Sequence, residues 1–139
     1  MRFAFKTSPQ NTTWRDMLAV WKEADGIELF ESGWTFDHFY PIFSDPAGPC
    51  LEGWMTLTAL AQATQRLRLG TLVTGIHYRH PAVLANMAAT LDIVSGGRLE
   101  LGIAPDGTRK SPAPTASNWA ARPSAATGSR KRVRSSSAC

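Results

Sequence analysis

The sequence has little cysteine, and what it has is not spaced for disulfide or metal chemistry. Of 139 residues only Cys50 and Cys139 are cysteines, one next to Pro49 and the other at the C-terminus. Such a pair provides neither a disulfide framework nor a zinc-ligand spacing, so we expect two thiols. His77 and His80 lie three residues apart, but no acidic residue lies nearby in the sequence to complete a metal site. We therefore expect no bound metal.

Long apolar runs are also missing. Arg2 and Lys6 near the N-terminus are not followed by a continuous apolar run, as an export signal would require. No stretch approaches the roughly 20 apolar residues that a membrane span needs. We therefore expect a cytoplasmic protein with no membrane partner.

Acidic residues are scarce in the last quarter of the chain. Residues 1–103 carry eight Lys and Arg against ten Asp and Glu, whereas residues 104–139 carry seven against Asp106 alone. The whole net charge of +4 therefore arises in the second part. That part also has only two large apolar side chains, Trp119 and Val133. We expect residues 1–103 to form a folded domain and residues 104–139 a low-complexity, basic and disordered tail.

Strand and helix patterns alternate through residues 1–103. We expect strands at residues 3–5, 32–39, 66–75 and 98–103, and helices at residues 11–25, 52–65 and 81–94. The order βαβαβαβ predicts parallel strands with right-handed crossovers, as in a doubly wound sheet or a (β/α)8 barrel. Because FKTSPQ follows the first strand in place of a GxGxxG turn, we favour the α/β class represented by the N-terminal half of a TIM barrel.

Two of the expected helices carry apolar residues at helical spacing, which we expect to face the sheet. In the first helix, which Thr12 or Thr13 would cap, they are Trp14, Met17, Leu18 and Trp21. In the third helix, which Pro81 opens, they are Val83, Met87, Leu91 and Val94.

Polar residues follow the second and third strands, at the end where barrels place their chemistry. Asp37 and His38 could donate, accept and relay protons near neutral pH. The alternative is that Asp37 caps the loop while His38 packs beside Phe39. Thr74 and Gly75 end the third strand, where a glycine either lets the backbone approach a flat ligand or makes a turn.

Three stretches carry a family resemblance: RFAFKTSPQ, SGWTFDHFYPIF and RLRLGTLVTGIHYRHPAVLANMAATLDIVSGGRLELGI. Through them residues 2–103 resemble the luciferase-like monooxygenase superfamily, and within it the deazaflavin-dependent oxidoreductases. The resemblance implies a TIM barrel that binds coenzyme F420, an 8-hydroxy-5-deazaflavin, or alternatively FMN. The implied enzyme is commonly a homodimer that transfers hydride between the deazaflavin C5 and an organic substrate.

The resemblance also implies roles for particular residues. Asp37 and His38 match the family's pair near the reactive face of the ring, with His38 also contacting the cofactor. Val73, Thr74 and Gly75 match a strand bulge that supports the ring from behind. Many family members have a non-prolyl cis peptide at this bulge.

After Ile103 the sequence departs from the family pattern. Members continue with a turn such as GAGWNE, whereas this chain reads APDGT. GC-rich codons for the former, read one base late, translate as the latter, so we expect a frameshift just after Ile103. Half a barrel would be poorly stable and without turnover. The competing interpretation is a non-catalytic protein whose basic stretch RKRVR, residues 130–134, binds nucleic acid. The codon agreement makes this the poorer account, and we expect no nucleic-acid partner.

Overall fold

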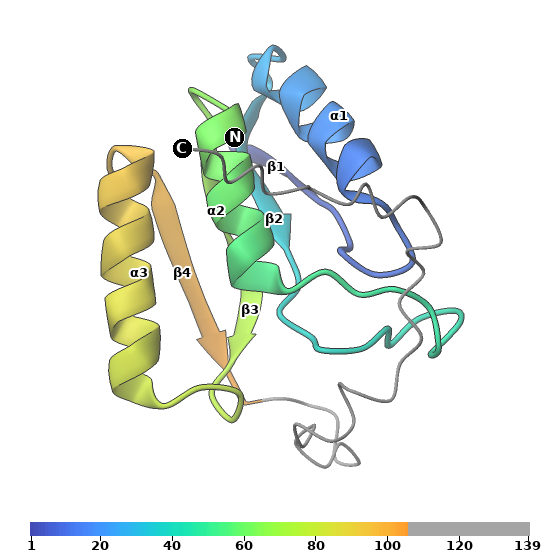
Figure 1. Ribbon diagram of the computed structural model, residues 1–139. Coiled ribbons are helices and arrows are strands. Elements are labelled where there is room, and N and C mark those ends of the chain that lie inside the picture. The colour runs from blue at the N-terminus through green and yellow to red at the C-terminus, as the bar shows by residue number, and fades with distance from the viewer. Residues whose placement is uncertain (106–139) are drawn as a thin grey trace, which may run out of the picture.

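Four parallel strands alternate with three helices in the computed structural model of the protein, which describes residues 1–105 (Figure 1). The strands are β1 (Phe3–Lys6), β2 (Phe30–Thr35), β3 (Arg68–Gly75) and β4 (Leu99–Ala104), paired in the order β1-β2-β3-β4. The helices are α1 (Trp14–Asp25), α2 (Gly53–Ala63) and α3 (Pro81–Ser95). Their buried side chains share one core cluster with β3, so all three cover the same face of the sheet. The predicted βαβαβαβ order and partial barrel are confirmed.

The second strand lies earlier in the chain than its sequence pattern indicated. β2 begins at Phe30, which pairs with Phe3, and ends at Thr35, which pairs with Thr71. Asp37 therefore belongs to the loop that follows the strand, together with the rest of the SGWTFDHF pattern beyond Thr35. The alternation of apolar and polar residues continued past the point where the neighbouring strands provide hydrogen-bond partners.

The fourth strand ends near the expected boundary. Ala104 pairs with Gly75 of β3, so the strand continues one residue beyond Ile103. β4 carries two exposed apolar residues, Leu101 and Ile103, which are 48% and 50% exposed. The tail expected over residues 104–139 falls, from residue 106 onward, outside the residues that the structure describes.

Helix α1 follows the sequence prediction closely. Thr13 caps it, because the Thr13 hydroxyl accepts a hydrogen bond from the backbone N–H of Asp16. Met17 and Trp21 are buried in the core, as expected. Trp14, in the first turn, is 38% exposed and lies outside the core cluster. All of the predicted apolar face except Trp14 therefore contributes to the core, with Leu18 partly buried against it.

Helix α3 begins and ends as predicted, but it buries a different face. His80 caps its N-terminus and Gly96 ends it in the left-handed conformation, with φ of 71°. The buried residues are Leu84, Ala88, Leu91 and Ser95, whereas Val83 and Val94 are 52% and 42% exposed. The prediction was right for Leu91, which is buried, and for Met87, which packs against the core, but wrong for Val83 and Val94. Apolar residues occur on several sides of this helix. The small side chains of Ala88 and Ser95 suit a close approach to α2 and β4.

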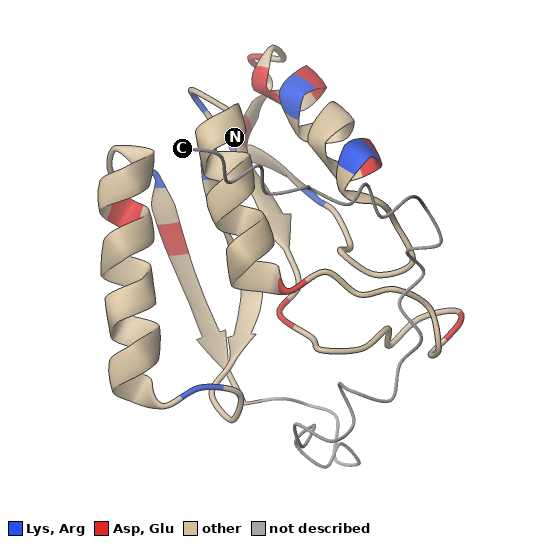
Figure 2. Ribbon diagram, in the orientation of Figure 1, with Lys and Arg blue, Asp and Glu red and all other residues tan. Residues whose placement is uncertain are grey.

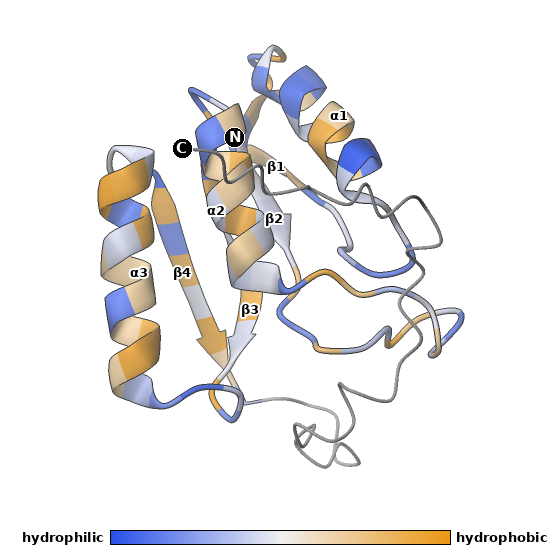
Figure 3. Cartoon of the chain, in the orientation of Figure 1, coloured by the Kyte–Doolittle hydropathy of each residue, from blue (hydrophilic) through white to orange (hydrophobic). Residues whose placement is uncertain are grey.

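Charge and hydropathy distinguish the helices (Figures 2 and 3). α1 carries charged residues on its outer side, whereas α2 has no charged residue and α3 has only Asp92. The core between helices and sheet is centred on Trp21, Trp54 and Leu57, each 1% exposed or less. Gly33 of β2 allows the Trp21 ring of α1 to pack directly against the sheet, because a Cβ at this position would lie 2.8 Å from that ring. Any other residue would displace that ring.

Two arginines hold the amino-terminal end of the sheet through backbone carbonyls. Arg66 donates to the carbonyls of Ile27 and Phe30 at 2.8 and 2.7 Å. Arg98 joins α2, α3 and the loop before β3 by donating to the carbonyls of Ala61, Ser95 and Leu67, at 2.6, 2.7 and 3.0 Å. These bonds satisfy carbonyls at helix ends and in the adjoining loops that the helical ladder leaves open. The end of the fold opposite the candidate site is thus fixed by side chain to backbone contacts.

Candidate functional site

A pocket of about 220 Å³ lies at the carboxyl ends of the strands. Its lining includes Lys6 of β1, Val73 and Gly75 of β3, and three residues from loops, Phe36, His38 and Tyr78. This is the end of the sheet where barrel enzymes build their active sites. Complete small-molecule sites usually measure about 300–1,000 Å³, so these walls enclose part of a cofactor-sized ligand.

His38 lies at this pocket with an unsatisfied ring nitrogen. The Nδ1 atom is buried and has no hydrogen-bond partner among residues 1–105. The ring meets Phe36 edge to face, with 6.1 Å between the centroids. Leaving a buried polar atom unpaired costs about 1–3 kcal/mol. A ligand group that bonds to Nδ1 would remove that cost.

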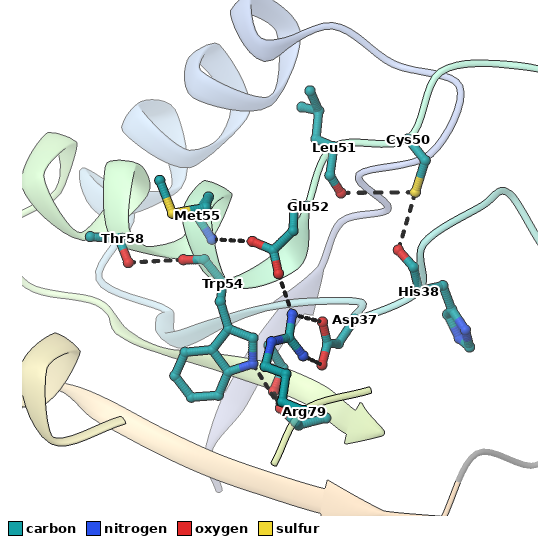
Figure 4. Close-up of polar contacts among 11 residues, drawn as sticks. Asp37, His38, Cys50, Leu51, Glu52, Trp54, Met55, Thr58 and Arg79 are labelled. Atoms are coloured by element: carbon teal, nitrogen blue, oxygen red, sulfur yellow. Dashed lines mark hydrogen bonds and ion pairs between the residues drawn. The ribbon is translucent and has the colours of Figure 1, made fainter. Parts of the chain in front are cut away.

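Asp37 borders the same pocket, but its carboxylate is bound by an arginine. It is 1% exposed, and its two oxygens accept hydrogen bonds from Arg79 at 2.6 and 2.9 Å. Burial raises the pKa of the Asp37 carboxyl, and the hydrogen bonds from Arg79 oppose that rise. Figure 4 shows the His38 ring turned away from this ion pair. Of the two residues predicted to be catalytic, His38 is the one that lines the pocket with a polar side-chain atom left unpaired.

Arg79 makes a second ion pair, with Glu52. Glu52 is the N-cap of α2 and accepts a hydrogen bond from the backbone N–H of Met55 at 2.6 Å. Burial lowers the pKa of the Arg79 guanidinium, but Asp37 and Glu52 outweigh that effect and hold the pKa above its ordinary value. Sequence reasoning missed both Arg79 and Glu52. The available signal was chemical, since a buried Asp37 requires a cation and Arg79 follows the neighbouring strand.

The predicted bulge in β3 is present. The register with β4 shifts between Thr71 and Thr74, and the peptide bond between Leu72 and Val73 is cis. Val73 and Gly75 line the pocket. The Thr74 side chain is fully buried on the helix side, where its hydroxyl accepts a hydrogen bond from the Trp54 indole at 3.2 Å and pairs with the Thr71 hydroxyl. Thr74 can therefore reach a ligand only through its backbone.

The remaining candidates are accounted for by local structure. The Nδ1 atom of His80 accepts a hydrogen bond from the backbone N–H of Ala82, so this residue caps α3. Within residues 1–105 no three His, Cys, Asp or Glu side chains lie close enough to hold a metal. Cys50 forms no disulfide in the described part of the chain, as expected. Cys139 lies outside it. No described helix is long and apolar enough to cross a membrane.

Comparison with known proteins identifies the family. The model of the luciferase-like monooxygenase family matches residues 1–123. The chain belongs to this family. The match to luciferase-like proteins extends past Ile103, where the composition of the chain changes.

Luciferase-like relatives of two cofactor types resemble this chain. The F420-dependent glucose-6-phosphate dehydrogenase of Amycolatopsis mediterranei (strain U-32) is 32% identical over 105 residues, 74% of this chain and 31% of the relative. The oxygenase component of the flavin-dependent trigonelline monooxygenase of Acinetobacter baylyi (strain ATCC 33305 / BD413 / ADP1) is 39% identical over 71 residues, 55% of this chain and 19% of the relative. The chain thus spans less than a third of the length of these curated relatives.

A solved structure shows the same fold. The coenzyme F420-dependent tetrahydromethanopterin reductase of Methanopyrus kandleri superposes with a TM-score of 0.57 and 29% identity, over 73% of this chain and 26% of the reductase. The family therefore contains F420-dependent oxidoreductases and flavin-dependent monooxygenases, and its members are enzymes.

Proposed function

We propose that this chain carries the first four strands of a coenzyme F420-dependent oxidoreductase that transfers hydride between the deazaflavin and an organic substrate. The observation that carries the proposal is the unpaired, buried Nδ1 of His38 in a pocket at the carboxyl ends of the strands. The 32% identical dehydrogenase and the 29% identical reductase are both F420-dependent, which favours deazaflavin. The alternative, an FMN-dependent monooxygenase, is favoured by the 39% identical flavin-dependent oxygenase component.

The residues of the pocket suit a flat, partly polar ring. Phe36, Leu72 and Val73 provide apolar walls, and Gly75 brings backbone to the same edge. His38 provides an unpaired nitrogen, and Lys6 provides a cation whose Nζ lies 4.6 Å from the Phe36 ring centroid. No carboxylate in residues 1–105 forms an ion pair with Lys6. These groups fit a deazaflavin or a flavin ring.

The roles proposed for individual residues follow from their positions. A bound deazaflavin would supply hydride transfer at its ring carbon. His38 would hold a proton at Nδ1 or accept one there. Asp37, bound to Arg79, would position His38 rather than exchange protons itself. Val73 and Gly75 would support the ring, with Thr74 contributing through its backbone.

The site in these four strands is only part of a complete one. TIM barrels often hold a cofactor's phosphates by the loops after strands seven and eight, which lie beyond the described residues. We therefore propose that the 139-residue chain binds the ring weakly and has no useful turnover. We also propose, from the codon agreement, a frameshift after Ile103. Sequencing the gene and its transcript across the codons for Leu101 to Arg109 tests it, because a single continuous frame would overturn it.

The proposed function is tested by titrating the 139-residue chain separately with F420 and FMN and following the fluorescence of each. We expect F420 to bind at least about tenfold more tightly than FMN, a difference of about 1.4 kcal/mol. H38A should lower F420 affinity by a similar factor, because it removes the unpaired nitrogen. Tighter binding of FMN would establish the alternative. A chain with folded circular dichroism that binds neither would refute both.

Oligomeric state and location belong to the same proposal. The resemblance implies that the intact enzyme is a cytoplasmic homodimer. Sedimentation of the complete enzyme would measure its mass, and a monomer at micromolar concentration would contradict this part of the proposal.

A further inference from the structure

We propose that Arg79 is a positioning residue that fastens the loop after β2 to the loop after β3 and thereby fixes His38 at the pocket. That a bound ligand contacts His38 in this position rests on the proposed function. The contacts of Arg79 with Asp37 and Glu52, which we call the clamp, lie within this chain and can be tested without any cofactor.

The clamp joins both ends of one loop to the next. Asp37 lies at the start of the loop between β2 and α2, and Glu52 lies at its end, where it caps α2. Arg79 comes from the loop between β3 and α3 and donates hydrogen bonds to both carboxylates. Figure 4 shows the guanidinium between the two acids. One side chain therefore holds the loop of residues 36–52 at its two ends.

Packing around the guanidinium leaves it little freedom. The Arg79 side chain is 10% exposed and its guanidinium carbon lies 5.5 Å from the centroid of the Phe39 ring. Phe39 in turn packs against Tyr78, with 4.5 Å between ring centroids. Gly53 allows α2 to begin against this group, because a Cβ there would lie 2.5 Å from the Phe36 carbonyl. Planar stacking and a bidentate fork are properties that Lys lacks.

His38 is bound to the clamp by the chain itself. It follows Asp37 directly, and its carbonyl oxygen accepts a hydrogen bond from the Cys50 thiol at 3.2 Å. Without the guanidinium, Asp37 and Glu52 would face each other with no cation between them. Two carboxylates in that arrangement repel, and Asp37 is buried, so the loop would move to bring water to them. Such a movement would carry His38 and Cys50 with it.

The labelling rate of the Cys50 thiol measures local opening of the loop, which can be distinguished from global unfolding of the chain. In a C139S background, Cys50 is the single thiol of the chain, and its rate of reaction with the disulfide reagent DTNB reports opening of the loop. The variants are R79M, which removes the charge, and R79K, which keeps the charge but loses the fork. R68M is the matched control, because it removes an arginine ion pair with Glu100 that lies on the sheet and outside the pocket lining.

We expect R79M to raise the Cys50 labelling rate at least about tenfold, R79K to give an intermediate rate, and R68M to stay within about twofold of the C139S parent. Circular dichroism and thermal melts of each variant identify any global loss of structure. A third variant, R79M with D37N and E52Q, removes the repulsion and should restore slow labelling in part. The clamp is refuted if R79M labels within twofold of the parent, or if R79M and R68M accelerate labelling equally.

Titration of the variants with F420 distinguishes the failure of this proposal from the failure of the proposed function. F420 titrations of the same variants should show weaker binding by R79M and unchanged binding by R68M. If the parent chain binds neither F420 nor FMN, the proposed function fails while the labelling rates still decide the clamp. If the parent binds F420 and R79M binds it equally well, Arg79 does not position His38.

Discussion

Arg98 provides the sharpest test of how this fold is held together. Its guanidinium donates to the backbone carbonyls of Ala61, Leu67 and Ser95, at 2.6, 3.0 and 2.7 Å, and so joins α2, the residue before β3, and α3. The side chain is half-buried. Substitution by Met keeps much of the aliphatic stem but removes all three bonds, together with a fourth to the Thr64 hydroxyl at 3.2 Å.

The expected size of the effect follows from these contacts. A hydrogen bond from a charged donor contributes about 1.5–3 kcal/mol. Since water can reach part of this region and rehydrate the carbonyls, we expect a total loss of about 2–4 kcal/mol rather than the sum of three full bonds. For a domain of this size each kcal/mol lowers the melting temperature by roughly 4–8 °C, so R98M should melt roughly 10–25 °C lower.

The assay is thermal unfolding followed by circular dichroism, with urea unfolding of the same samples. R98K should recover less than half of the loss, because an ammonium cannot reach three carbonyls in a planar arrangement. R68M breaks a half-exposed ion pair and two long hydrogen bonds to the carbonyls of Gly97 and Leu99, at 3.5 and 3.3 Å, and should cost less than R98M. A melting temperature of R98M within about 3 °C of the parent would show that the three bonds do not stabilise the fold. Cys50 labelling should stay within about twofold of the parent, since Arg98 lies at the opposite end of the sheet from the pocket.

Three further predictions concern stability. Burial raises the pKa of Asp25, but the backbone N–H groups of residues 65–67 outweigh it and hold the pKa below its usual value. The stabilisation is therefore complete above the unfolded pKa near 4 and lost as pH falls through the folded value, and D25N should flatten urea-unfolding stability below about pH 4. A stability curve equally steep in D25N would contradict this. G33A should destabilise by about 1–3 kcal/mol, because its Cβ would lie 2.8 Å from the Trp21 ring; an unchanged melt would show that the ring yields freely. T13A removes the α1 cap and should lower the free energy of urea unfolding by about 1 kcal/mol, whereas T13S keeps a hydroxyl cap and should leave it unchanged.

The order of helices and strands followed from the sequence because each element buries one face. Periodicity located α1 with its cap at Thr12 or Thr13, of which the structure uses Thr13, and Pro81 marked the start of α3. The buried face of α3 did not follow, since apolar residues surround the helix and only packing against α2 and β4 selects the line through Leu84 and Leu91. Spacing rules work where one face is apolar and the other is not.

The position of the site could be predicted from the sequence, but the ion pair between Asp37 and Arg79 could not. Strand ends placed His38 and Gly75 in one pocket, and the resemblance placed the bulge at Val73. The bond between Asp37 and Arg79 could not be read from spacing, because the two residues come from different loops and meet only after the strands align. Contacts between side chains of different loops depend on tertiary structure. The end of the sheet at which those loops lie follows from the order of the strands.

The contacts of Arg66 and Arg98 have a bearing on how such a protein can change over time. Both bind mainly to main-chain oxygens, which every residue type supplies, so their partners can mutate without loss of the bond. At the other end of the sheet, side chains bind side chains, and each replacement there alters what the pocket accepts. A scaffold divided in this way can exchange its specificity loops for others while the strands keep their places. This division is a physical basis on which relatives with one fold can include both a dehydrogenase and an oxygenase component.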